Sequence, residues 1–105
     1  MAQEKVGIVE GWTGNIDFRL LADGSAQNLT GMTVVAVGYD RLRNAVTLIG
    51  DVTVLSATGG TVRLQPDAND FIEAASPYEL RFKVTDGGLD TFFPSEEPIL
   101  VTVRK

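Results

Sequence analysis

Residues 78–85 alternate strictly between apolar and polar side chains, and this alternation constrains the fold more than any other feature of the chain. Successive side chains of a β-strand point to opposite faces of its sheet. The alternation therefore predicts a strand with Tyr78, Leu80, Phe82 and Val84 facing a core and the polar residues facing water. A sheet with one dry face and one wet face is typical of an antiparallel sandwich or barrel.

Shorter segments repeat the pattern along the chain. They predict strands over residues 16–20, 51–55, 61–64 and 99–104, with Phe18 among the inward-facing residues. Residues 32–39 differ, because they are apolar on both faces. A strand of this kind is usually central in its sheet, or its second face is covered by a neighbour. The N-terminal segment is also apolar on both faces and is the candidate for that cover.

Turn-forming residues separate the predicted strands at short intervals. Asn28 fits the first position of a type I turn that ends at Gly31, and this turn predicts that Leu29 folds into the core. The Asp-Gly pair at residues 23–24 fits a type I′ hairpin, whose two central residues need a positive φ. The residues expected to form turns are Asp23, Gly24, Asn28, Gly31, Asp86 and Gly87.

One short helix is predicted within residues 66–76, with Pro66 just outside it. Asp67 fits its N-cap, and Asp70 falls near the positive end of the helix dipole. Pro77 ends the helix, which would carry the chain from one sheet to the other. Tyr78 follows directly and is placed for a tyrosine corner, in which a tyrosine hydroxyl bonds to the backbone a few residues upstream.

These elements predict an all-β fold, an immunoglobulin-like antiparallel β-sandwich of about seven strands with one short crossing helix. The chain of 105 residues suffices for one domain. We expect residues 14–105 to form the sandwich and residues 1–13 to form an N-terminal segment available as an assembly strand. The core residues expected from the pattern are Phe18, Leu29, Tyr78, Leu80, Phe82 and Val84.

The composition excludes several classes of function. The chain has neither cysteine nor histidine, so Ser-His-Asp triads, Cys-His pairs and ordinary zinc sites are unavailable. Its acidic clusters lack the ordered set of oxygen ligands that a calcium loop needs. We expect no enzyme activity, no cofactor and no bound metal. The net charge of −5 argues against nucleic-acid binding. The N-terminal segment contains no long apolar run, so we expect neither a signal peptide nor a membrane span.

Several stretches resemble the immunoglobulin-like N-terminal domain of the phage baseplate upper protein family. They are Ala-Asp-Gly at 22–24, Asn-Leu-Thr-Gly-Met-Thr-Val at 28–34, the segment 78–88 with the later Phe93-Pro94, and the final apolar strand. The resemblance covers roughly residues 14 to 104. These are turn and core motifs, so they are more specific for the fold than for the function.

The resemblance implies a non-enzymatic structural protein of a tailed-phage virion, at the baseplate or tail tip. Such a protein is made in the host cytoplasm, is located in the virion, and contacts other virion structural proteins and further copies of itself. Two alternatives stay open. The chain could be a capsid decoration or head-fibre protein, or a carbohydrate-binding module for a host-surface glycan, in which Trp12 or Phe92 stacks on sugar.

The N-terminal segment is the leading candidate for an assembly contact. Val6 and Ile8 face one way on an extended strand and Val9 faces the other, so one strand face cannot bury all three. Such a segment can add as a strand to a sheet edge of its own domain or of a neighbour. Both alternatives stay open. The residues expected to make contacts are Val6, Ile8, Val9, Trp12 and Phe92.

Overall fold

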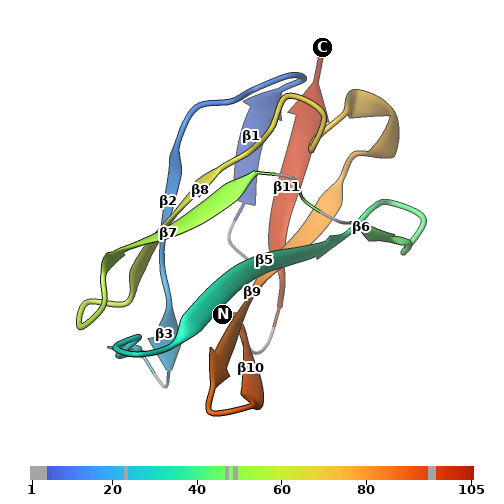
Figure 1. Cartoon of the computed structure of the whole chain (residues 1–105). Helices are drawn as coiled ribbons and strands as arrows, with labels where there is room; N and C mark the ends of the chain where they lie inside the picture. The colour runs from blue at the N-terminus through green and yellow to red at the C-terminus, as the bar shows by residue number, and fades with distance from the viewer. Residues whose placement is uncertain (1–4, 23, 47, 49, 95–96) are drawn as a thin grey trace.

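The computed structural model describes residues 5–22, 24–46, 48, 50–94 and 97–105. Two β-sheets pack against each other as a sandwich (Figure 1). The larger sheet has the order β1 (Lys5–Val9), β11 (Ile99–Arg104), β9 (Tyr78–Asp86), β5 (Thr33–Tyr39) and β6 (Ala45–Val46), and β10 (Leu89–Phe93) pairs with β9. The smaller sheet has the order β2 (Ile16–Arg19), β8 (Thr61–Gln65) and β7 (Asp51–Ser56). A short hairpin joins β3 (Leu21–Ala22) to β4 (Ser25–Ala26).

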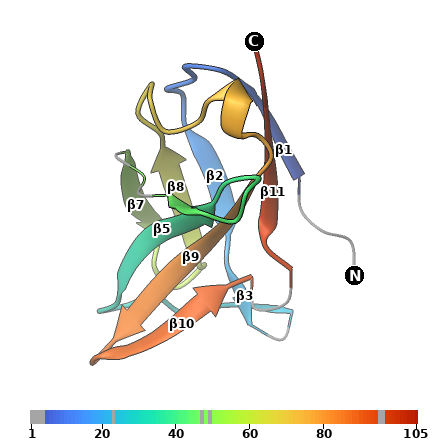
Figure 2. The same cartoon turned by 90° about the vertical axis from the view of Figure 1, so that its right-hand side faces the viewer.

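The strand order is that of an immunoglobulin-like sandwich. Strands β2, β8 and β7 stand where strands B, E and D stand in that fold, and β9, β5 and β6 stand in the places of F, C and C′. Strands β10 and β11 lie end to end along one edge of β9, in the place of strand G. Figure 2 shows the smaller sheet on one side of the molecule and β1 with β11 on the other. The predicted all-β sandwich is confirmed.

Strand β1 departs from the antiparallel pattern that the sequence predicts. It pairs in parallel with β11, from Lys5 beside Leu100 to Val9 beside Arg104. The chain crosses to the other sheet after β1, so nearly the whole domain separates the two partners. Parallel neighbours require such a crossover connection. The N-terminal segment is thus the first strand of its own sandwich.

The core lies between the two sheets, as the alternation predicts. Strand β9 alternates between buried and half-buried residues along its length. The ring of Phe82 lies 5.1 Å from that of Phe18 across the two sheets, measured between ring centroids. The predicted core residues Phe18, Leu29, Tyr78, Leu80, Phe82 and Val84 are all buried.

The segment that crosses from β8 to β9 is less helical than predicted. Its helix is a single 3-10 turn, η1 (Glu73–Ala75), and it follows Ile72 rather than Asp67. The carboxylate of Asp70 accepts hydrogen bonds from the backbone N–H groups of Asp67 (2.8 Å) and Gly50 (2.7 Å). These bonds hold residues 67–70 in a turn tied to the chain before β7, which is why no helix starts at Asp67.

The turn before β5 closes one residue later than predicted. The N–H of Met32 donates to the carbonyl of Leu29 (3.0 Å), and Gly31 has a φ of +75°. A glycine with positive φ at the third position is characteristic of a type II turn. Asn28 stands just outside and accepts a hydrogen bond from the Thr30 N–H through its side chain (3.0 Å). Leu29 is buried, as expected.

The other two predicted turns connect adjacent strands. Gly87 and Gly88 both have positive φ and form the two-residue loop between Asp86 and Leu89, which is the geometry of a type I′ hairpin. Gly24 also has positive φ, between β3 and β4, whereas its predicted turn partner Asp23 lies outside the described residues.

Strand β7 is one of the two edge strands of the smaller sheet, and β2 is the other. Its pairing with β8 shifts register between Val54 and Ser56, which leaves Leu55 in a bulge. Both Val54 and Leu55 are exposed.

Candidate functional site

Strand β5 is apolar on both faces, and its outer face is open to solvent. Val34 and Gly38 are buried toward the core. On the other face, Val35 is 39% exposed and Tyr39 is 46% exposed, with Val37 half-buried between them. We call Val35, Val37 and Tyr39 the apolar stripe.

The N-terminal segment does not cover the apolar stripe, so that prediction is wrong. Strand β1 lies at the far edge of the larger sheet, separated from β5 by β11 and β9. It is held there because Ile8, only 7% exposed, packs into the core. The Glu10 carboxylate adds a second tie by accepting a hydrogen bond from the Glu73 N–H (3.0 Å).

A stripe of charged residues runs along β9 beside the apolar stripe. It consists of Glu79, Arg81 and Lys83, and we call it the charged stripe. The strand register places Tyr39 beside Glu79, Val37 beside Arg81 and Val35 beside Lys83. On the other side of β9, Phe92 stands beside Lys83 and Leu100 beside Glu79. The outer face of the larger sheet thus carries apolar residues on both sides of a charged stripe.

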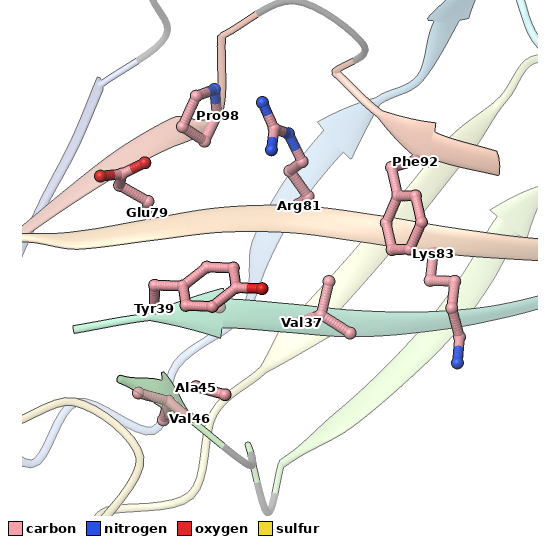
Figure 3. A pocket seen from close by; sticks show the side chains of 10 residues that line it. Val37, Tyr39, Ala45, Val46, Glu79, Arg81, Lys83, Phe92 and Pro98 are labelled. Carbon is pink, nitrogen blue, oxygen red and sulfur yellow. The ribbon is translucent and has the colours of Figure 1, made fainter. Parts of the chain in front are cut away.

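A shallow hollow of about 450 Å³ lies in this face. Val37, Ala45 and Val46 contribute apolar groups to it. Figure 3 shows the rings of Tyr39 and Phe92 on either side of Val37. Phe92 is 44% exposed, so both rings that border the hollow present much of their surface to solvent.

The cations of this face differ in their contacts. Arg81 donates a hydrogen bond from Nε to the Pro94 carbonyl (3.2 Å), and Figure 3 shows its guanidinium directed toward Pro98. Glu79 forms an ion pair of 3.5 Å with Arg43, whose side chain is largely exposed. Lys83 has no hydrogen-bond or ion-pair partner in the part of the chain that the structure describes. The described side chains that line the hollow thus include two cations, Arg81 and Lys83, and one carboxylate, Glu79.

The structure separates the residues predicted to make contacts. Ile8 belongs to the core, so its assignment as a contact residue is wrong, and Val6 is half-buried against the same core. Val9 and Trp12 are exposed, and the Trp12 ring lies against Gly14. Of the five, Phe92 alone borders the hollow.

The two aromatic residues considered for glycan stacking do not come together. Trp12 lies in the connection from β1 to β2, and Phe92 lies in β10. Figures 1 and 2 show these two segments at opposite ends of the sandwich. They cannot form one platform for a sugar.

The remaining residues of the face were not singled out from the sequence. The apolar stripe had a visible signal, because residues 32–39 are apolar on both faces. The charged stripe had none, since Glu79, Arg81 and Lys83 read as the ordinary wet side of a strand. Their significance comes from the neighbours that the sheet gives them.

The described residues hold no group of three or more Asp, Glu, His or Cys that could bind a metal ion. The clearest electrostatic pair is Asp17 with Arg63, 2.8 Å apart on β2 and β8 of the smaller sheet. The hydrogen bond from Arg63 lowers the pKa of Asp17 below its ordinary value of 3.8. No helix in the described part of the chain is long and apolar enough to span a bilayer.

No protein-family model matches this chain, and no curated protein matches it. The case for a function therefore rests on the outer face of the larger sheet and on the resemblance in sequence.

Proposed function

We propose that the chain is a non-enzymatic structural module and that it acts through protein–protein contacts made by the outer face of the larger sheet. The observation that carries the proposal is the open apolar stripe. Aliphatic and aromatic side chains on one sheet face normally face a core or a partner. Here the core lies on the other side of β5, so a partner is the physical explanation for Val35, Val37 and Tyr39.

The composition of the face supports a protein partner. Interfaces are enriched in aromatic residues and arginine. Tyr39 and Phe92 provide exposed rings, and Arg81 and Lys83 provide cations beside them.

The larger assembly that we propose is a tailed-phage virion, at its baseplate or tail tip. This step rests on the resemblance of residues 14–104 to the N-terminal domain of the phage baseplate upper protein family. A place on the capsid, as a decoration or head-fibre protein, would use the same kind of contact and is the second candidate.

Particle association tests the proposal. We expect the chain to co-sediment with tailed particles purified on a density gradient from cells that produce the chain and the particles. Val35→Glu should abolish this association, because it puts a charge in the apolar stripe. Val54→Glu is the matched control, since Val54 is 37% exposed but lies on β7 of the smaller sheet.

The proposal is wrong if the wild-type chain stays in the soluble fraction of the lysate. If particles from cells that produce the Val35→Glu variant carry as much of the chain as particles from cells that produce Val54→Glu, the outer face is not the contact. Antibody against the chain on negatively stained particles then separates a tail position from a capsid position.

A further inference from the structure

We infer that the outer face of the larger sheet pairs with the same face of a second copy of this chain, related to the first by a twofold axis. The inference rests on the proposed function for the use of this face and adds the identity of one partner. The basis is the order of the side chains along the apolar stripe and the charged stripe. This order is self-complementary when a second copy faces the first with its strands running in the opposite direction.

The charged stripe has an acid at one end and a base at the other. Glu79 and Lys83 stand two residues to either side of Arg81, on the same face of β9. Consider a twofold axis that lies between the two faces and crosses the strands at Arg81. It places Lys83 of each copy over Glu79 of the other. A twofold interface makes every contact twice in this way, so both charge pairs form together.

The same axis matches the apolar residues on both sides of the charged stripe. On β5 the axis places Val37 over Val37 of the other copy, and Val35 over Tyr39 of the other copy. On the other side of β9, Phe92 stands beside Lys83 and Leu100 beside Glu79, so reversal places Phe92 over Leu100. Each apolar residue considered thus meets an apolar residue.

A different orientation of the copies loses this match. An axis that runs along the strands would place Glu79 over Glu79 and Lys83 over Lys83, and like charges opposed across an interface are unfavourable. The reversed arrangement brings the two Arg81 positions together at the axis. Each Arg81 side chain is held by its own chain there, because its Nε donates a hydrogen bond to the Pro94 carbonyl (3.2 Å). Aligned packing of two sheets, with strands within about 30° of each other, suits this arrangement.

Sedimentation velocity over a wide concentration range tests the inference. We expect the wild-type chain to form dimers as its concentration rises from low to high micromolar. Lys83→Glu and Glu79→Lys should each raise the dimer dissociation constant by about tenfold or more, a change that corresponds to about 1.4 kcal/mol. The double variant Glu79→Lys/Lys83→Glu restores opposite charges across the axis and should recover most of the affinity.

Two controls make the same changes of charge on the smaller sheet. Arg19→Glu on β2 matches Lys83→Glu, and Asp51→Lys on β7 matches Glu79→Lys; both positions are exposed. Neither control should change the dimer. A cooperative thermal melt for every variant shows that the fold is retained.

A wild-type chain that stays monomeric at all concentrations overturns the inference, and so does a double variant that is no better than the single ones. These results leave the proposed function to the particle assay. A monomeric chain whose particle association is lost in Val35→Glu would have a different protein as the partner of this face. If the chain dimerises through this face but the Val35→Glu variant enters particles as well as the wild type does, the proposed function alone is refuted.

Discussion

The hydroxyl of Tyr78 accepts a hydrogen bond of 3.0 Å from the backbone N–H of Ile72. The two residues bracket the last part of the crossing segment, residues 73–77, and the Phe71 ring packs edge-on against the Tyr78 ring with 5.0 Å between the ring centroids. This is the bond of a tyrosine corner. It fixes the end of the crossing segment directly where the central strand of the larger sheet begins.

Tyr78→Phe should therefore destabilise the domain. The substitution keeps the ring and its contact with Phe71, and it leaves the Ile72 N–H without its acceptor. An unpaired, partly buried N–H costs about 1–3 kcal/mol. Urea unfolding measures the loss. Tyr39→Phe, at the exposed tyrosine, is the control and should change the free energy of unfolding by less than about 0.5 kcal/mol. Equal effects from the two substitutions would contradict the corner.

Truncation of either of two core residues, one in a strand and one in a turn, should lower the free energy of unfolding. Phe82→Ala should cost about 3–5 kcal/mol and Leu29→Ala about 2–5 kcal/mol, because both side chains are fully enclosed. Leu42→Ala is the control, since Leu42 is largely exposed in the loop between β5 and β6. Denaturant curves that show less than about 1 kcal/mol for both core variants would remove them from the core.

Neighbouring residues of β1 should respond in opposite ways. Ile8 packs into the core, and Val9 faces solvent beside Arg104. Ile8→Ala should cost about 2–5 kcal/mol, whereas Val9→Ala should stay within about 0.5 kcal/mol of the wild type. Thermal melts of the two variants give the comparison. The reverse order would mean that β1 is not docked on the sandwich as its pairing with β11 requires.

The ion pair on the smaller sheet should be visible in a titration. Arg63 lowers the pKa of Asp17, so the folded protein binds this proton less readily than the unfolded chain. The stabilising contribution is therefore fully present above the ordinary pKa of 3.8 and is lost as the pH falls through the lower folded value.

Carboxyl carbon chemical shifts followed by NMR give the Asp17 pKa directly. Arg63→Gln should return the pKa toward 3.8, whereas Arg19→Gln, on the same strand as Asp17, should leave it low. An Asp17 pKa that is the same in the wild type and in Arg63→Gln would show that the pair is not formed in solution.

Glycine 60 should tolerate substitution less well than Gly87. Both have positive φ, which disfavours any side chain. A Cβ atom at Gly60 would also lie 2.8 Å from the carbonyl oxygens of Leu20 and Gln27, whereas a Cβ atom at Gly87 meets nothing. Gly87→Ala measures the conformational cost alone, and Gly60→Ala adds the clash. Chemical denaturation should rank Gly60→Ala as the less stable variant by a clear margin.

Local pattern was sufficient to predict the sandwich and most of its core. The alternation at 78–85 fixes the faces of β9, and Leu29 is buried as expected although its turn runs from Leu29 to Met32, one residue later than predicted. These features depend on residues that are close together in the chain. The parallel pairing of β1 with β11 joins residues near the two ends, and no local pattern specifies such a partner.

The predictions for the crossing segment and for the cover of the outer face were wrong for the same physical reason. Contacts between residues that are distant in the sequence decide both. A helix does not start at Asp67 because the Asp70 carboxylate accepts a hydrogen bond from the N–H of Gly50, which is distant in the sequence. The open face of β5 was visible as an apolar run. Whether another segment covers it depends on where β1 docks, which Ile8 decides through the core.

The bulge at Leu55 limits how copies of this chain can associate. A strand from a neighbouring chain needs an unbroken row of backbone groups in order to pair along an edge. The register shift in β7 interrupts that row on the smaller sheet. Open-ended growth of sheets into fibres is thereby opposed at this edge. Association through a twofold face, as we infer for the larger sheet, closes on itself and gives finite complexes.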